Sequence, residues 1–328
     1  MICKRKHLLQ RRHEKLKVIL LSVALISITL FAEGQQTPLN PGSYRVYSPF
    51  ILNPGITGSK DFTAIDLAGV IQGDNKSYLL SANTRLSKLV TGYFNTPGTK
   101  AFTNIGLGGA LFNDVIGTSR SIGALASVSY QLPVGSNNTS FVSFGATLKG
   151  IYNIMDSVSD LDLPEKKTFI PNADVGVYFY NPTFYAGISA TNLVGNLLDS
   201  TDMSNYRMPV SRQYYFIAGA KIIVNKYYRV IVEPSIIVNY GDSISNEYSE
   251  LIEPMLKVYL DNFCFGAFMQ NYDNISLFFQ YRFPRIYVGT CVDFPRGTSF
   301  YKKDLAIELA IGFRLSGFKS ALGGNWHW

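Results

Sequence analysis

Apolar and polar residues alternate with a period of two along most of the chain after residue 60. Residues 305–315 are the clearest case, because large apolar side chains occupy every second position of LAIELAIGFRL and small or charged ones stand between them. The segments 122–132, 142–152 and 173–179 repeat the pattern. Alternation over such lengths predicts β-strands that have one apolar and one polar face.

About fourteen segments show this alternation, and many of them are 10 to 14 residues long. Strands of globular proteins usually have about 5–6 residues, whereas a tilted strand that crosses a membrane needs about 9–11. An even number of long strands suits an antiparallel barrel with both chain ends on one side. We therefore predict an all-β fold, a transmembrane antiparallel β-barrel of about 14 strands. The predicted strands lie near 61–72, 76–88, 101–113, 119–132, 140–154, 170–181, 183–191, 212–224, 227–240, 250–260, 262–270, 274–283, 285–294 and 304–315.

The links between these segments differ in length according to their position in the chain. Links after the sixth, eighth, tenth and twelfth segments are very short, and links after several odd-numbered segments are long. Short turns on one rim and long loops on the other are typical of outer-membrane barrels. The link 90–100 departs from this rule, because it is long and follows an even-numbered segment.

The polar face consists mainly of small neutral residues, and the chain contains 21 Tyr and 22 Phe, many of them at strand ends. Aromatic residues at strand ends favour the interfacial girdles of a membrane barrel. In that fold the apolar face points to lipid and the polar face to the lumen. A secreted, water-soluble β-protein would instead turn the apolar face inward, and it remains the alternative fold.

The N-terminus has the three parts of a secretory signal peptide. Residues 1–17 carry seven basic side chains and one acidic one, residues 18–31 are apolar, and Ala32-Glu33-Gly34 has the small-x-small form of a cleavage site. We predict a cleaved signal peptide over residues 1–34, with a signal anchor as the alternative. The remaining chain divides into an N-terminal periplasmic segment (35–60), the barrel (61–315) and a C-terminal tail (316–328).

Removal of the predicted signal peptide lowers the net charge and leaves few side chains that could act in catalysis. The formal charge of +7 falls to +2, because 23 basic and 21 acidic side chains remain, so nucleic acid binding has no support. Only one of three histidines remains, His327, which leaves too few ligands for a His/Cys zinc site or a Ser-His-Asp triad. We expect no catalytic, metal-binding or cofactor-binding residues. Cys264 and Cys291 also remain, but a chain of this size does not need a disulfide.

Several charged side chains fall on the predicted lumen face. The candidate lumen charges are Asp66, Arg85, Lys149, Lys221, Glu308 and Arg314. Asp66 and Arg85 could face each other across the first two strands, either as an ion-selective constriction or as a structural or solvated pair. Glu308 and Arg314 share one face of the last strand and have the same two interpretations. The acidic loop residues Asp160, Asp162 and Glu165 lack the ligand order of a calcium-binding loop.

Two glycine-containing stretches have no obvious chemistry. Gly106, Gly108 and Gly109 do not precede a helix and so do not form a phosphate-binding loop; on an inner barrel face they would let bulky lumen elements approach. In residues 48–59, SPFILNPGITGS, the Asn-Pro dipeptide and the second glycine are predicted to bend the chain into the first strand. We expect Phe50, Ile51 and Leu52 to bury against the periplasmic mouth or the inner wall, which makes the stretch either a structural plug or an entry turn.

Several motifs follow one another along the chain. They include Asn53, Pro54, Gly58 and Ser59 after the leader, and Asn113, Asp114 and Gly117 in IGLGGALFNDVIG. Residues 172–194 (NADVGVYFYNPTFYAGISATNLV) and the closing AIELAIGFRL complete the series. In this order the motifs resemble the PorP/SprF family of type IX secretion system outer-membrane proteins, over about residues 45–315. Residues 55–57 (GIT) and Gly312 depart from the family pattern.

The resemblance implies a non-catalytic barrel in the outer membrane of a Gram-negative bacterium, in contact with outer-membrane lipid. It would support the secretion or surface attachment of cargo such as adhesins of gliding motility. Its implied partners are that cargo and the periplasmic and lipoprotein subunits of the type IX machinery. A diffusion pore or small-solute transporter is the alternative function, because the predicted lumen is polar and lined by small residues.

Overall fold

The computed structural model describes residues 42–60, 62–86, 104–117, 119–134, 139–155, 166–194, 212–225, 227–241, 251–270, 274–295 and 305–315. All of them belong to one compact unit, Gln36–Trp328. Within these ranges, no helix is long and apolar enough to cross a membrane. The predicted leader, the C-terminal tail, the acidic residues at 160–165 and the link 90–100 lie outside the described residues.

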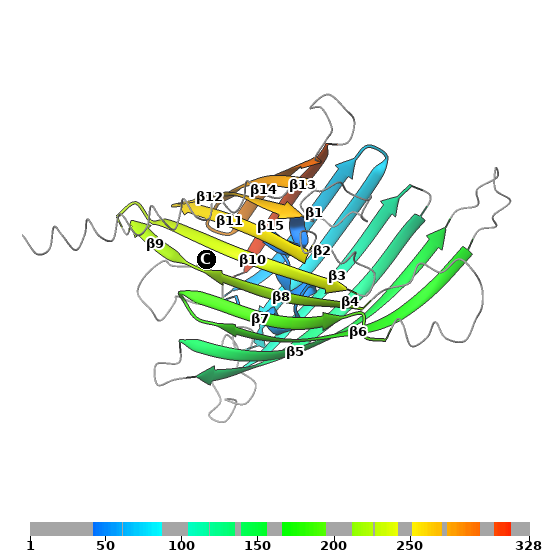
Figure 1. The fold of residues 1–328 in the computed structure, drawn as a ribbon, viewed down its shortest axis with the longest axis horizontal. Helices are drawn as coiled ribbons and strands as arrows, with labels where there is room; N and C mark the ends of the chain where they lie inside the picture. The colour runs from blue at the N-terminus through cyan, green and yellow to red at the C-terminus, as the bar shows by residue number, and fades with distance from the viewer. Residues whose placement is uncertain are drawn as a thin grey trace, which may run out of the picture. The chain divides into compact units, whose positions relative to one another are not determined.

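The described strands form a single antiparallel sheet that closes on itself (Figure 1). β1 pairs with both β2 and β15, and β10 pairs with β11, so the order of strands forms a ring. The strands are β1 (Thr63–Gln72), β2 (Asn75–Arg85), β3 (Ile105–Ile116), β4 (Ser119–Val134), β5 (Ser140–Met155), β6 (Lys166–Tyr180), β7 (Phe184–Thr191), β8 (Gln213–Ala220), β9 (Ile222–Asn225), β10 (Val230–Gly241), β11 (Ile252–Leu260), β12 (Phe263–Gln270), β13 (Asn274–Arg282), β14 (Ile286–Pro295) and β15 (Ala306–Leu315).

β9 is the continuation of β8 beyond Lys221, since both pair with β10. The wall therefore has fourteen strand positions, and the prediction of a fourteen-stranded barrel is confirmed. Each predicted strand overlaps one of these positions. β6 begins at Lys166 rather than near residue 170, so the preceding link is shorter than expected.

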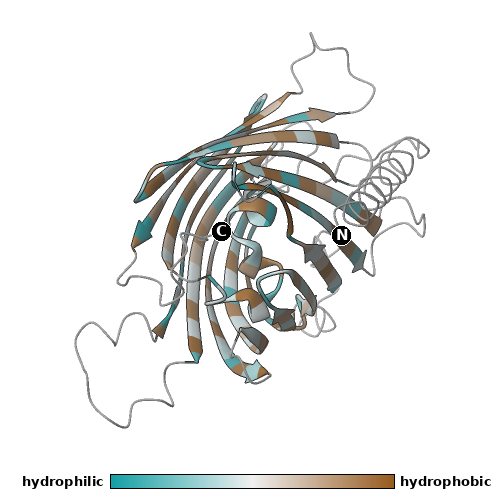
Figure 2. Ribbon diagram, turned by 90° about the vertical axis from the view of Figure 1, so that its left-hand side faces the viewer, coloured by the Kyte–Doolittle hydropathy of each residue, from teal (hydrophilic) through white to brown (hydrophobic). Residues whose placement is uncertain are grey.

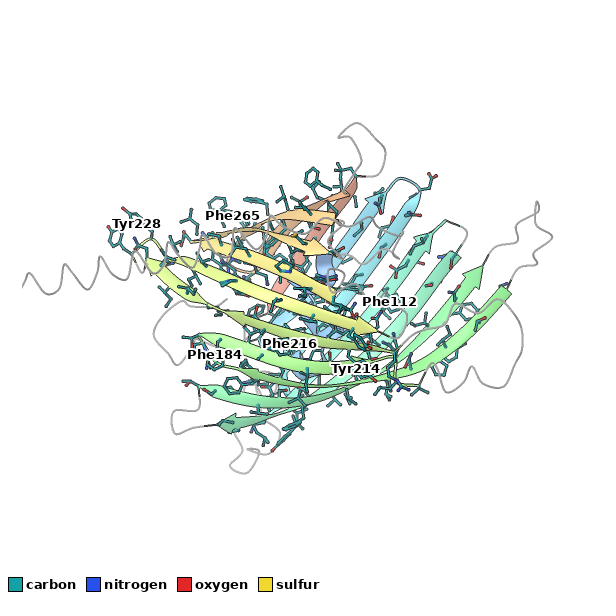
Figure 3. All side chains as sticks on the ribbon, viewed as in Figure 1. Phe112, Phe184, Tyr214, Phe216, Tyr228 and Phe265 are labelled. Carbon is teal, nitrogen blue, oxygen red and sulfur yellow. The ribbon has the colours of Figure 1, made fainter. Side chains whose placement is uncertain are left out.

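The two faces of the wall are divided as the alternation predicts. In β15, Glu308 is 1% exposed and Ala310 2%, whereas Leu309 between them is 63% exposed. Figure 3 shows Phe184, Phe216 and Phe265 among the side chains on the strands, and all three are exposed. An exposed apolar outer face and a polar inner face are the arrangement of a barrel surrounded by lipid.

The two rims are named here by their links. The short-turn rim carries the tight connections after β6, β9, β11 and β13. There Asn181 forms an Asx turn, because its side-chain oxygen accepts from the Thr183 and Phe184 N–H groups at 2.8 and 2.7 Å. The long-loop rim carries the longer links between β5 and β6, β7 and β8, and β10 and β11, together with a tight turn at residues 73–74 and another that begins at Gly117. In a barrel of this class the short turns face the periplasm.

The segment before β1 does not join the wall. Residues 42–60, called the plug from here on, fold into α2 (Gly42–Val46), η1 (Pro49–Ile51) and η2 (Pro54–Ile56). Figure 2 shows these short helical turns surrounded by the strands.

Candidate functional site: the segment inside the barrel

Burial shows that the plug is part of the packed interior. Ser48, Asn53 and Thr57 have no exposed surface, although all three are polar. Phe50 and Leu52 are buried in one apolar cluster with wall residues, and Ile51 packs against that cluster while partly buried. The expectation of burial against the inner wall is confirmed for Phe50 and Leu52, whereas Ile51 is only partly buried. Tyr47 stacks on Tyr287 of β14, with ring centroids 5.5 Å apart.

Asn53 fixes both the turn and its position against the wall. Its side-chain oxygen accepts from the Gly55 N–H at 2.8 Å, which caps η2, and Pro54 occupies the first turn, where its missing N–H costs nothing. The side-chain nitrogen donates to the carbonyl oxygens of Val177 and Ile188 at 3.2 and 3.3 Å. These two residues are partners across β6 and β7. One amide therefore joins the plug to two neighbouring strands.

Thr57 makes the corresponding contacts with β4. Its hydroxyl lies 2.7 Å from that of Ser127, and its carbonyl oxygen accepts from Ser129 Oγ at 2.6 Å and Gln131 Nε2 at 3.0 Å. The wall therefore supplies hydrogen-bond donors to the buried Thr57 carbonyl oxygen, which avoids the free-energy cost of an unsatisfied buried acceptor.

Gly58 is the hinge between the plug and β1. It adopts φ +69°, a left-handed conformation that favours glycine. Its N–H donates to Asn83 Oδ1 at 2.7 Å, and its carbonyl oxygen accepts from Arg85 Nε at 3.0 Å. The next residue, Ser59, donates its N–H to the Ile56 carbonyl at 3.0 Å and completes the turn.

An ion pair holds the other end of the plug. Arg45 in α2 donates from Nε and Nη2 to the two carboxylate oxygens of Glu253 in β11, at 2.7 and 2.6 Å. Both side chains are 2% exposed. A bidentate ion pair that is buried away from water fixes the orientation of α2 relative to β11. Loss of either partner would leave the other charge buried and unpaired. Sequence reasoning did not identify this pair, because 208 positions separate its members and no local motif marks either one.

Glycines in the wall provide the space that the plug occupies. These residues, called the glycine wall, are Gly106, Gly108, Gly145, Gly176 and Gly187. A Cβ on Gly145 would lie 2.2 Å from the Pro54 carbonyl, and one on Gly176 would lie 2.1 Å from Asn53 Oδ1. The predicted role of inner-face glycines therefore holds for Gly106 and Gly108. For Gly109 the prediction is wrong, because alternation along β3 turns it to the outer face with the exposed Leu107 and Leu111, and a Cβ there would meet only the Leu125 carbonyl oxygen at 3.4 Å.

The candidate lumen charges Asp66 and Arg85 contact other residues rather than each other. Asp66 accepts a hydrogen bond from the Tyr287 hydroxyl and lies 3.9 Å from Lys60 Nζ of the plug. Arg85 contacts Gly58 and the Tyr180 hydroxyl. Burial lowers the pKa of the Lys60 ammonium, and the nearby Asp66 carboxylate opposes that shift.

The other lumen charges lie at separate places on the inner wall. Lys149 pairs with Asp174 at 2.8 Å across β5 and β6. Glu308 is buried in β15, and the Arg314 guanidinium lies 5.0 Å from the centre of the Phe62 ring. Lys221 joins β8 to β9, with its N–H donating to the Thr183 carbonyl at 2.7 Å.

The motif residues near the end of β3 lie at the long-loop rim and have structural partners. Asn113 accepts from Arg120 Nε at 3.1 Å, and Asp114 accepts a hydrogen bond from Ser77. Gly117 has φ +57° and donates its N–H to Asn75 Oδ1 at 3.0 Å. These contacts tie two tight hairpins together.

The residues that the structure describes include no group of three or more His, Cys, Asp or Glu side chains arranged to hold a metal ion. Cys264 and Cys291 are buried free thiols.

Comparison with known proteins gives a family and a set of similar folds. Solved structures that resemble the chain include the CymD monoaromatic hydrocarbon channel, at 13% identity and a TM-score of 0.43, with 87% of this chain and 94% of that chain covered. A Pseudomonas aeruginosa FadL homologue is 9% identical, with a TM-score of 0.40 and 88% and 96% of the two chains covered. These likenesses carry no argument about function. No curated protein matches the chain.

A family model described as "Type IX secretion system membrane protein PorP/SprF" matches residues 34–313. The match includes the plug and every strand of the barrel except the last two residues of β15. The protein therefore belongs to the PorP/SprF family of type IX secretion system membrane proteins.

Proposed function

We propose that this barrel is a non-catalytic outer-membrane component that supports the secretion or surface attachment of type IX cargo. The cargo class is a surface protein such as a gliding-motility adhesin, and the other partners are periplasmic and lipoprotein subunits of the machinery. The observation that carries the proposal is the plug, taken together with family membership. A barrel whose interior is occupied by its own chain offers rims and an outer wall for binding, rather than a channel.

The alternative, a diffusion pore or small-solute transporter, requires an open lumen. Residues 42–60 occupy that space and contact β2, β4, β6, β7 and β11 through hydrogen bonds. The plug therefore supports an attachment role over a transport role.

Export through a cleaved leader is part of the same proposal. Cleavage after Gly34 would give a mature chain that starts at Gln35. N-terminal sequencing of the protein purified from outer membranes tests this point, and retention of residues 18–31 would contradict it.

The functional test is surface display of type IX cargo in the host bacterium. Cargo on intact cells is labelled with a membrane-impermeant biotin reagent, in the parent strain, a strain lacking this gene, and the same strain carrying the wild-type gene. We expect one or more cargo proteins to disappear from the surface without the gene and to return with it. Unchanged labelling of all type IX cargo would refute the proposal.

A further inference from the structure

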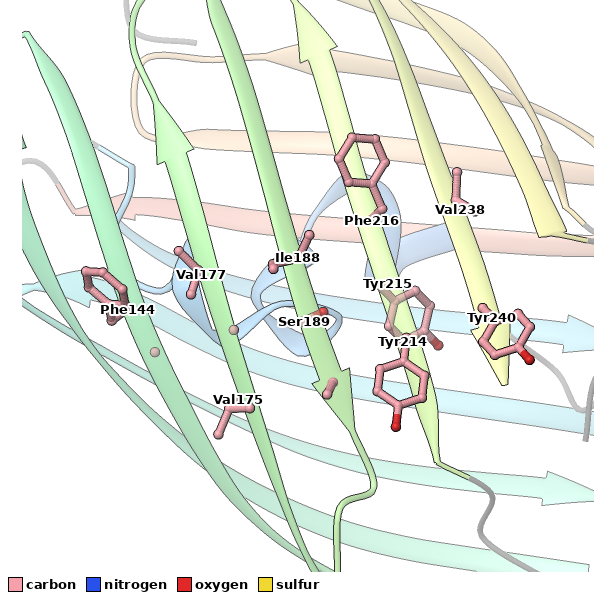
Figure 4. A pocket seen from close by; sticks show the side chains of 13 residues that line it. Phe144, Val175, Val177, Ile188, Ser189, Tyr214, Tyr215, Phe216, Val238 and Tyr240 are labelled. Atoms are coloured by element: carbon pink, nitrogen blue, oxygen red, sulfur yellow. The ribbon is translucent and has the colours of Figure 1, made fainter. Parts of the chain in front are cut away.

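A groove is present on the outer wall, where strands β5, β6, β7, β8 and β10 lie side by side (Figure 4). This open groove has a volume of about 530 Å³, within the size range of sites that hold small molecules. The outer groove is lined chiefly by Phe144, Val175, Ile188, Tyr214, Phe216 and Tyr240. We propose that the outer groove is a binding site for a lipid acyl chain.

The position of the groove on the barrel indicates which molecules contact it. Val175, Ile188 and Phe216 project from the face of the wall that carries the exposed apolar side chains. In a barrel of this kind that face is in contact with the hydrocarbon of the membrane. The material available to fill a depression there is therefore an acyl chain.

The lining has an apolar body and one polar end, as an amphiphile requires. Tyr214 is the second residue of β8 and Tyr240 the second-last of β10, so both lie at the long-loop end of their strands. They are paired across the two strands, with ring centroids 6.4 Å apart. Tyrosine at such a position presents its ring to hydrocarbon and its hydroxyl to the polar head-group region. The bound lipid would place its head group at these hydroxyls and its chain along Ile188 and Phe216.

At the floor of the groove the barrel wall separates it from the plug. Gly145 and Gly176 are partners across β5 and β6, and both line the groove. Their missing side chains would point inward, toward Pro54 and Asn53 of the plug. The wall here is only one backbone layer thick, with the plug on the inner side and the groove on the outer side. No side chain from these two residues fills either space.

The test uses the full-length barrel, extracted from outer membranes in a mild detergent and examined by native mass spectrometry. Ala190 also lines the outer groove, between Val175 and Tyr214. Ala190→Trp fills the site. The matched control is Ala126→Trp, which adds the same side chain to the exposed lipid face of β4. We expect wild type and Ala126→Trp to retain a lipid adduct, and Ala190→Trp to lose it by about tenfold or more.

The double variant Tyr214→Phe/Tyr240→Phe keeps both rings and removes the hydroxyls. It folds with the same apolar surface, so it tests the polar end if Ala190→Trp does not fold. We expect its adduct to be reduced while heat-modifiable migration on gels stays normal. Absence of an adduct from wild type, or equal adducts on all variants, would overturn the proposal. Loss of a bound protein rather than a lipid from Ala190→Trp would also overturn it, in favour of a protein-docking surface.

Discussion

Gly145 faces the carbonyl of Pro54, and a Cβ built on it would come within 2.2 Å of that group. Gly109, also in the barrel wall, would meet only Leu125 at 3.4 Å. Period-two alternation puts Gly109 on the outer face with Leu107 and Leu111, and Gly145 on the inner face with Ser143 and Thr147. It does not identify what Gly145 meets there, because that contact joins residues 54 and 145, and no local pattern encodes it.

These two glycines give a matched pair of substitutions. We expect Gly145→Ala to destabilise the barrel by about 1–3 kcal/mol, because the added methyl group overpacks a filled site. Gly109→Ala should lie within about 0.5 kcal/mol of wild type, as expected away from tight contacts. Urea unfolding in detergent, followed by circular dichroism, measures the difference. Equal midpoints for the two variants would show that the glycine wall does not limit the position of the plug.

The Arg45–Glu253 pair makes a second residue-scale prediction. Arg45→Met alone leaves the Glu253 carboxylate buried without its partner and should cost about 3–5 kcal/mol. The double variant Arg45→Met/Glu253→Leu removes both charges and should recover much of that loss. A double-mutant cycle on unfolding free energies gives the coupling. Additive effects of the two single changes would mean that the ion pair is not what holds α2.

At the scale of elements, the strands could be predicted because each carries its own signal. Period-two alternation is local, and every predicted strand overlaps a strand position of the barrel. The ends were less predictable. β6 starts at Lys166, inside a stretch assigned to a loop, because it pairs with residues up to Met155 on the long β5. The sequence likewise predicts one strand over 212–224 and not the break at Lys221, although β8 and β9 on its two sides both pair with β10.

For residues 48–59 the sequence predicts a structural plug or an entry turn that buries three apolar residues, but not its helical turns or its partners. The Asn-Pro dipeptide marks a turn in any context, and the helical turns around it are each three to five residues long. Such short elements are stable only when tertiary contacts support them. Those contacts come from strands 25 to 208 residues away, so the sequence around position 53 could not indicate them.

Gly58 connects the plug to β1 and provides a prediction for the element as a whole. Gly58→Val would force a β-branched residue to φ +69° and press it against the Gly106 backbone, 2.5 Å from its Cβ. We expect the plug to be displaced and to become sensitive to protease. Limited proteolysis followed by mass spectrometry should detect new cuts within residues 42–60.

Gly117→Val is the control for that experiment. Gly117 also has a positive φ, +57°, but nothing lies within 4 Å of an added Cβ. It carries the same backbone strain without the contact to the wall. Cuts within residues 42–60 in both variants would attribute the effect to strain in general rather than to the seating of the plug.

At the scale of the whole molecule, a filled interior predicts the absence of conduction. Planar bilayers containing wild-type barrel should show no steady current. A variant lacking residues 44–57 loses the described contacts from Arg45 through Thr57 and should produce discrete open steps. A steady conductance from wild type, equal to that of the deletion variant, would favour the diffusion-pore alternative.

The junction of the plug with β1 has a consequence for how the ring of strands is aligned. β1 starts at Thr63, five residues after Gly58, and it forms the closing seam with β15 from Thr63↔Leu315 to Ile71↔Ile307. A slip of two residues at this seam would keep the same faces inward, so alternation alone does not forbid it. It would, however, shift β15 and the strands beyond it by about 7 Å relative to β1 and the plug, and so separate Arg45 from Glu253 of β11 and Tyr47 from Tyr287 of β14. The plug, which contacts strands on both sides of the seam, thus selects one register for the pairing of β1 with β15.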